Sequence, residues 1–242
     1  LIGAGSRYEK PVLAGASHFL EHMLFKGTPT RSALDISRAI ESRGGYFNAF
    51  TQEDATCYHV RLPYEYMTEA VDVLMDMYLN ASLRQEDFDR ERNVILEEMK
   101  MYQDQPQWVV QEKFQGAMFS GHPLGAPISG SEKSLQAMTP RSLAAYKDKM
   151  YIPSNTVFAF AGSLKHEQAV ECVERALADK RKSSAPKYRP VDAQVRQIPI
   201  TIERRDVNQI QAVLGFRIFS LHDDRLNSAR VQNRLLVQLR LS

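Results

Sequence analysis

Two histidines and a glutamate lie within five residues near the start of this chain, and they constrain it more than any other feature. His18, Glu21 and His22 form the pattern H-x-x-E-H. On a helix, residues four apart share one face and have Cβ atoms about 5–6 Å apart, so both imidazoles can bind one metal ion. Glu21 cannot align with both histidines, but it can reach a water on that metal. The pattern therefore predicts a helix at 15–25 that presents a metal-binding pair.

The metal that fits this pair best is zinc. Zinc accepts imidazole nitrogens at about 2.0–2.1 Å, and its catalytic sites use three protein ligands and leave one position for water. The pattern is the H-E-x-x-H zinc motif in reverse order, which is an inverted zinc-protease signature. A satisfied pair of surface or core histidines is the alternative explanation.

A predicted long helix at 85–103 supplies the third ligand. Phe88 and Ile95 mark the stripe that faces the core, and Glu98 lies on the same stripe. Glu97 is rotated by about 100° toward solvent. Because a buried carboxylate without a partner is costly, a carboxylate on this stripe suggests a neighbouring cation. The periodicity favours Glu98 over Glu97 as the ligand.

A second acidic residue, Glu91, lies seven positions before Glu98 on the same stripe. Its predicted role is to accept a hydrogen bond from a ligating histidine, which fixes the tautomer of that ring. The alternative for both Glu91 and Glu98 is an ordinary ion pair with an arginine or lysine such as Arg92.

Helical and strand-like patterns alternate along the chain, which predicts an α+β (mixed α/β) fold with a sheet flanked by helices. The second strand of the predicted hairpin alternates apolar and polar side chains. The expected helices are 15–25, 32–42, 64–79, 85–103, 107–119, 140–150, 166–180 and one from 224, and the expected strands are 46–51, 54–62, 156–161, 198–204 and 209–216.

A basic stretch rich in serine and proline interrupts these patterns and predicts a linker at 186–195. We expect a metallopeptidase-type domain at 1–185 that lacks one or more N-terminal strands. Residues 196–242 are expected to be the truncated beginning of a second, related domain, because the strand and helix patterns restart there.

Charge and hydropathy narrow the classes of partner. The formal net charge is +2, which argues against a dedicated nucleic-acid surface. No stretch approaches the roughly 18 apolar residues of a membrane-spanning helix. The two cysteines lack metal-ligand spacing and are expected to be buried thiols, so they leave the cellular compartment open.

Several segments together resemble the M16 (pitrilysin-type) metallopeptidases, in particular mitochondrial processing peptidase and its bacterial relatives. The resemblance covers nearly the whole chain. The segments are GSRYE at 5–9, GASHFLEHMLFKGT at 15–28, GGYFNAFT at 44–51, ERNVILEE at 91–98, HPLG at 122–125 and YIPSN at 151–155.

This resemblance implies roles for particular residues. It implies a Zn²⁺ ion bound by His18, His22 and Glu98, with Glu21 as the general base and Glu91 as the supporting carboxylate of the catalytic site. It also implies that the segment with Asn48, Ala49 and Thr51 contacts an extended peptide substrate, for which strand addition at a sheet edge is a physically sensible mode. An ordinary core hairpin is the alternative for that segment.

The function that follows is a zinc-dependent endopeptidase acting on peptides or on unfolded, presequence-like segments. The alternative is a non-catalytic scaffold or partner subunit of the same fold, which fold alone would not exclude. The resemblance also implies a second half or partner subunit that closes around the peptide. The compartment implied is the bacterial cytoplasm or periplasm, or the mitochondrial matrix.

Overall fold

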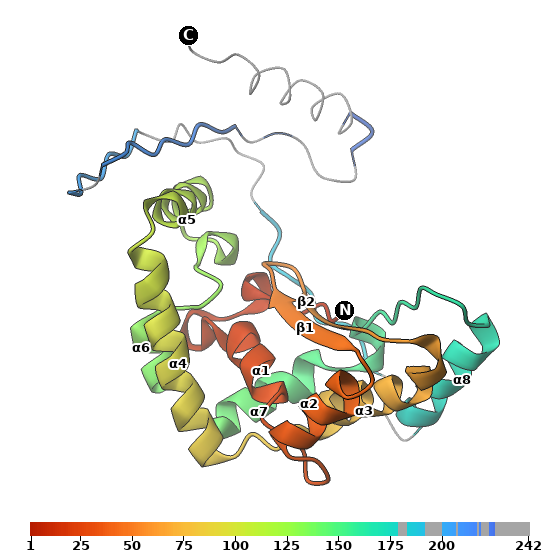
Figure 1. Cartoon of the computed structure of the whole chain (residues 1–242). Coiled ribbons are helices and arrows are strands. Elements are labelled where there is room, and N and C mark those ends of the chain that lie inside the picture. The colour runs from red at the N-terminus through yellow and green to blue at the C-terminus, as the bar shows by residue number, and fades with distance from the viewer. Residues whose placement is uncertain (179–182, 192–199, 207, 217, 219–222, 226–242) are drawn as a thin grey trace. The chain divides into compact units, whose positions relative to one another are not determined.

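A computed structural model of the chain describes residues 1–178, 183–191, 200–206, 208–216, 218 and 223–225 (Figure 1). The chain divides into two units, Leu1–Val191 and Asp192–Ser242. The division falls inside the segment 186–195 that we expect to be a linker. All of the regular secondary structure in the described residues lies in the first unit.

Helices dominate the first unit, and a small hairpin provides its sheet (Figure 1). This arrangement confirms the predicted α+β class. Central helix α1 contacts the hairpin, α4 and α7. The elements are α1 (Ala16–Leu24), α2 (Ala33–Glu41), β1 (Tyr46–Thr51), β2 (Thr56–Arg61), α3 (Met67–Asn80), α4 (Gln85–Gln103), α5 (Pro106–Met118), α6 (Glu132–Ala137), α7 (Pro140–Met150) and α8 (His166–Leu177), with short 3₁₀ turns at Ser6–Tyr8, Pro11–Leu13, Tyr64–Tyr66, Pro123–Gly125 and Pro153–Asn155.

The hairpin pairs β1 and β2 antiparallel, from Tyr46 opposite Arg61 to Thr51 opposite Thr56. Ile2 extends it on the far side of β2, where it bridges both Thr56 and Thr156. On the other side, the outer edge of β1 has no strand partner within the described residues. Backbone N–H and C=O groups on such an edge are available to another extended chain.

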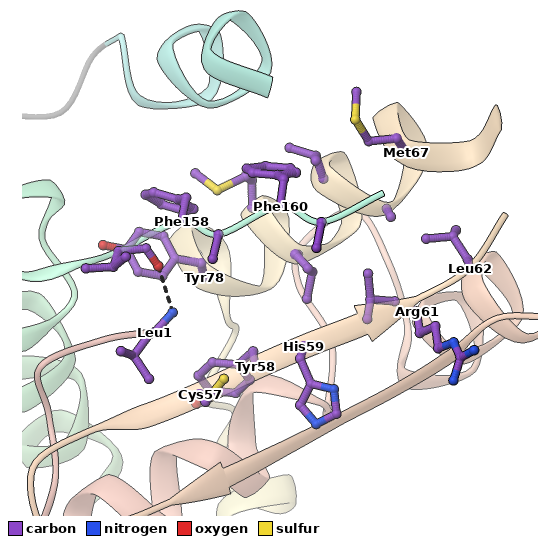
Figure 2. A pocket seen from close by; sticks show the side chains of 18 of the residues that line it. Leu1, Cys57, Tyr58, His59, Arg61, Leu62, Met67, Tyr78, Phe158 and Phe160 are labelled. Carbon is purple, nitrogen blue, oxygen red and sulfur yellow. Dashed lines mark hydrogen bonds between the residues drawn. The ribbon is translucent and has the colours of Figure 1, made fainter. Parts of the chain in front are cut away.

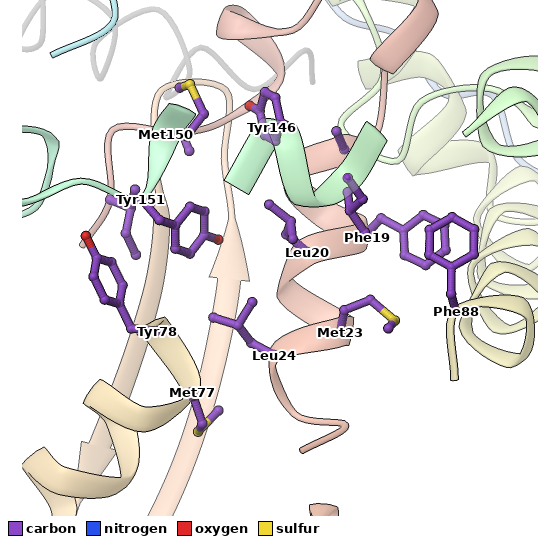
Figure 3. Packing of buried hydrophobic residues seen from close by; sticks show 14 of the residues in the cluster. Phe19, Leu20, Met23, Leu24, Met77, Tyr78, Phe88, Tyr146, Met150 and Tyr151 are labelled. Atoms are coloured by element: carbon purple, nitrogen blue, oxygen red, sulfur yellow. The ribbon is translucent and has the colours of Figure 1, made fainter. Parts of the chain in front are cut away.

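The core forms where α1 packs against its neighbours (Figure 3). Phe19 on α1 stacks on Phe88 of α4 with ring centroids 4.3 Å apart, and both side chains are fully buried. Burying an aromatic or large aliphatic side chain stabilises the fold by about 1.5–3 kcal/mol. Leu20, Met23 and Leu24 continue the buried face of α1. The packing of this face therefore determines how α1 sits relative to α4.

One predicted strand in the first unit is wrong. Residues 156–161 are extended but form no strand, and Thr156 makes a single isolated bridge to Ile2. A strand requires a partner along its length, and among the described residues only Leu1 and Ile2 pair with this segment, at Thr156 and Val157. The apolar pattern indicated an extended conformation but could not supply the partner.

The strands predicted at 198–204 and 209–216 are also wrong for the residues that the structure describes. Residues 200–204 and 209–216 have no strand, and Ile200 and Ile210 are more than 90% exposed. The alternating pattern needs a second strand and a covering layer to become a half-buried strand. Residues 198–199, most of the helix expected from 224 and the end of the helix expected at 166–180 lie outside the described residues.

An apolar groove of about 420 Å³ runs between β2 and residues 156–162 (Figure 2). Helix α3 forms its floor, and its labelled lining includes Leu62, Tyr78 and Phe158. None of the predicted metal ligands lines it, so the groove is separate from the candidate site. Among the described residues, no helix has the length and hydropathy needed to cross a membrane.

Candidate metal centre

Hydrogen bonds to a buried carboxylate hold the first turn of helix α1 in place. Gly15 adopts the left-handed conformation, with φ of +92°, which favours glycine. The buried carboxylate of Glu9 accepts hydrogen bonds from the backbone N–H groups of Gly15 and Ser17, both at 2.7 Å. These bonds satisfy N–H groups that a helix start leaves without partners, and the negative charge suits the positive end of the helix dipole. The histidines therefore follow an anchored first turn.

The structure brings His18, His22 and Glu98 together. The two imidazole rings have centroids 4.7 Å apart and are inclined by 76°. Oε2 of Glu98 lies 3.8 Å from Nε2 of His18 and 3.6 Å from Nε2 of His22. Ligand atoms of a tetrahedral zinc site with bonds of roughly 2.0–2.2 Å are about 3.4 Å apart. The donor set and its spacing therefore fit a zinc ion.

Glu97 and Glu98 point to opposite environments, although they are neighbours on α4. The Glu97 side chain is 71% exposed and pairs with Lys100 at 2.7 Å. The Glu98 side chain is 33% exposed and faces the two imidazoles. The helical rotation of about 100° between neighbours produces this difference. Of the two carboxylates, Glu98 is the one placed to bind a metal.

Glu91 lies behind the imidazole pair, and its side chain is 4% exposed. Its Oε2 lies 3.1 Å from Nδ1 of His22. A carboxylate accepting from Nδ1–H leaves the Nε2 lone pair of the neutral ring free for a metal. Arg92, the alternative partner considered for Glu91, instead pairs with Asp89. A lysine does pair with Glu91, but it is Lys26, whose Nζ lies 2.7 Å from Oε1.

Lys26 was missed by the sequence reasoning. Its one local signal is its position four residues after His22, which would place it on the same side if α1 continued. The helix ends at Leu24, however, so the contact depends on the loop that follows. His18 has no comparable partner, since its Nδ1 is buried without a hydrogen bond to any described residue.

Burial shifts the pKa of two groups on α1, His18 and Glu21. It lowers the pKa of the His18 imidazole to about 4, with a smaller contribution from the charge of His22. A neutral imidazole is the form that binds a metal. Burial also raises the pKa of the Glu21 carboxyl, while the Thr51 hydroxyl and His22 act in the opposite direction. A raised pKa suits a carboxylate that must both accept and release a proton.

The predicted substrate-contact residues divide into two groups. Oγ1 of Thr51 donates a hydrogen bond of 2.5 Å to Oε2 of Glu21, so this hydroxyl faces the candidate base. Asn48 is exposed on β1, where its amide Nδ2 donates to the Tyr46 hydroxyl and its Oδ1 accepts from the backbone N–H of Ala49. All three residues lie on β1, whose outer edge has no strand partner among the described residues. Thr51 also connects β1 to α1 through its hydrogen bond to Glu21.

Comparison with known protein families matches nearly the whole chain to two profiles. Residues 1–132 match the family described as insulinase (peptidase family M16), and residues 137–242 match the peptidase M16 inactive domain. Two solved structures share the fold. A protease from Helicobacter pylori has a TM-score of 0.71 and 22% identity, over 82% of this chain and 46% of that one. The periplasmic protease PqqL from Escherichia coli has a TM-score of 0.70 and 24% identity, over 80% and 22%.

Curated relatives are similar in sequence as well. An uncharacterized zinc protease of Mycobacterium leprae is 38% identical over 221 residues, which cover 89% of this chain and 49% of the relative. An uncharacterized zinc protease of Bacillus subtilis is 34% identical over 236 residues, which cover 97% and 57%. The chain thus spans about half the length of these relatives. Because the insulinase-type profile matches more than half of the 242 residues, the chain belongs to the M16 peptidase family.

Proposed function

We propose that this chain carries the catalytic half of a zinc-dependent endopeptidase. The observation that supports the proposal is the convergence of His18, His22 and Glu98 within 4.8 Å, with Glu21 on the same helix as the imidazoles. Three protein ligands that leave a fourth position open are the pattern of a catalytic rather than a structural zinc site. Relatives named as zinc proteases are consistent with this assignment.

A zinc ion in this site would lower the pKa of its water toward about 7 and polarise the peptide carbonyl. Glu21 accepts a proton from the attacking water at its carboxylate and then delivers that proton to the leaving amine. Thr51 holds Oε2 of Glu21 by its hydrogen bond, which leaves Oε1 for the water. Glu91 keeps His22 oriented through Nδ1.

The open edge of β1 provides a binding place for an extended peptide. Strand addition uses backbone hydrogen bonds and requires little sequence preference from the substrate. Ala49 is small and half-buried, so it permits close approach, and the exposed amide of Asn48 can both donate to and accept from a peptide backbone. We propose that substrates are extended peptides or unfolded segments that add to this edge, and that a second half or partner subunit encloses them.

The decisive experiment compares zinc content and peptide cleavage in the full-length protein and its Glu21→Gln variant. We expect the variant to bind zinc like the wild type but to lose cleavage, because its ligands remain and its base does not. Glu97→Gln is the matched control, since it changes an exposed carboxylate on the solvent side. Near-normal turnover by Glu21→Gln would contradict the role of Glu21. Wild-type protein that retains no zinc after dialysis would favour the scaffold alternative.

A further inference from the structure

We propose that Lys26 is a positioning residue of the metal centre, which fixes the Glu91 carboxylate so that Glu91 holds His22 in its metal-binding orientation. The inference rests on the proposed zinc function. Three side chains form a linear series: Nζ of Lys26 lies 2.7 Å from one oxygen of Glu91, and the other oxygen lies 3.1 Å from Nδ1 of His22. Lys26 itself is outside the ligand set.

The Glu91 carboxylate needs an external restraint. Its terminal torsion joins sp³ and sp² carbons, which gives a broad preference rather than sharp rotamer wells. The side chain is 4% exposed, so solvent cannot readily satisfy an oxygen that loses its partner. With Lys26 holding Oε1, rotation that removed Oε2 from His22 would also break a charge-assisted bond. The lysine thus stabilises the orientation that the imidazole uses.

The loop after α1 directs Lys26 toward Glu91. The backbone N–H of Lys26 donates to the carbonyl of Met23, and its own carbonyl accepts from the guanidinium of Arg84, just before α4. Gly27 follows with φ of +114°, a left-handed conformation that favours glycine. The carbonyl of Gly27 accepts from the backbone N–H of Ser82. This short loop is therefore anchored to the segment that leads into α4, the helix that carries Glu91.

Whether replacing Lys26 weakens or strengthens zinc binding distinguishes a positioning role from direct charge repulsion. A lysine ammonium near a divalent cation repels it, so removing that charge directly would strengthen zinc binding. Removing a restraint on His22 would weaken zinc binding instead, and loss of an outer partner of a metal ligand typically costs 10–100-fold in affinity. Weaker binding in a Lys26 variant would therefore have to act through Glu91.

The test measures zinc affinity of the full-length protein by competition with a chelating dye. We expect Lys26→Met to weaken zinc binding at least about tenfold, and Lys26→Arg to recover most of the loss because it restores a cation. Lys26→Met combined with Glu91→Gln should bind no more weakly than Glu91→Gln alone. Lys100→Met is the matched control: it removes an ion pair of the same 2.7 Å length, on the solvent side of α4, and should leave affinity unchanged.

Thermal unfolding of each variant distinguishes a positioning effect from loss of the fold. Lys26→Gln is a second variant that keeps a polar head but lacks the reach and the charge, and it should weaken binding as Lys26→Met does. Unchanged or tighter zinc binding by both variants would overturn the proposal. So would additive losses in the double variant. A wild-type protein that binds no zinc would instead contradict the proposed function.

Discussion

Helices α1 and α4 both supply residues of the candidate metal site, yet the protein holds them in different ways. Six of the nine residues of α1 are buried, against three of the nineteen residues of α4. Helix α1 carries both imidazoles and the candidate base, so the helical repeat itself sets the distances among them. Helix α4 contributes carboxylates whose positions depend on how the helix packs. The site therefore combines a rigid part with a part that tertiary packing must place.

Helix α4 is held by packing against α1, α5 and α6. Phe88 stacks on Phe19 of α1, and Ile95 is fully buried about two turns further along the same face. Arg92, whose guanidinium lies over the Phe88 ring, donates to the carbonyls of Leu135 and Met138 near α6. Because Glu98 lies three residues beyond the last fully buried residue of α4, its position depends on these contacts. Changes in α4 therefore test how much of the metal site is determined by packing.

The largest expected effect separates the two neighbouring carboxylates of α4. We expect Glu98→Gln to weaken zinc binding by more than the roughly 10–100-fold that loss of an outer partner costs, because it removes a charged ligand. Glu97→Gln should change zinc affinity little, since Glu97 pairs with Lys100 in solvent. Zinc titration of both variants checks the ranking. Comparable losses in the two would show that α4 is rotated, so that Glu98 does not face the two imidazoles.

The contrast between the helices explains which features were predictable from sequence. Periodicity predicted α1, α4 and the inward direction of Glu98, because each depends on local geometry. The choice of Lys26 as the partner of Glu91 depends on a loop conformation, which periodicity does not encode. The short helix α6 was also missed, because six residues contain too little of a repeat to identify.

The hairpin also shows that local patterns predict a segment's conformation but not its distant partners. Alternating side chains and a short connection predicted β1 and β2, because adjacent strands of a hairpin pair locally. Residues 156–161 resembled a strand equally well, but their pairing depends on Leu1 and Ile2, more than 150 positions away. Patterns within one segment thus predict its conformation more reliably than its partners.

A smaller effect on zinc affinity is expected from loosening the packing of α4 without changing a candidate ligand. Phe88→Ala removes the ring that stacks on Phe19 and should lower the free energy of unfolding by about 3–5 kcal/mol. Zinc affinity should fall as well, because Glu98 would occupy a wider range of positions relative to the imidazoles. Denaturant unfolding and zinc titration measure the two effects. Val94→Ala on the exposed side of α4 is the control and should change stability by less than about 0.5 kcal/mol.

Reduced stability without reduced zinc affinity in Phe88→Ala would contradict this view of α4. That result would mean that the metal itself draws Glu98 into place, so that packing is dispensable for the site. In that case packing would set the positions of the α1 residues, whereas metal binding would set the position of Glu98 on α4.

The smallest expected effect concerns the contact between β1 and α1. Thr51→Val keeps a branched side chain of similar size but removes the hydroxyl that donates to Oε2 of Glu21. Losing one positioning bond to the base should lower kcat about tenfold, which corresponds to about 1.4 kcal/mol in the barrier. Zinc affinity should not change, because Thr51 contacts no candidate ligand. Steady-state kinetics beside zinc titration separates the two.

Thr51→Ser provides the matched variant, since it retains the hydroxyl and should keep most of the wild-type kcat. If Thr51 served instead to bind the peptide, Thr51→Val would raise KM and leave kcat nearly unchanged, because lost ground-state binding appears in KM. Asn48→Ala should show that KM pattern, as its amide lies on the exposed strand and contacts neither Glu21 nor a candidate ligand. Two residues three positions apart on β1 would then divide the tasks of orienting the base and holding the substrate.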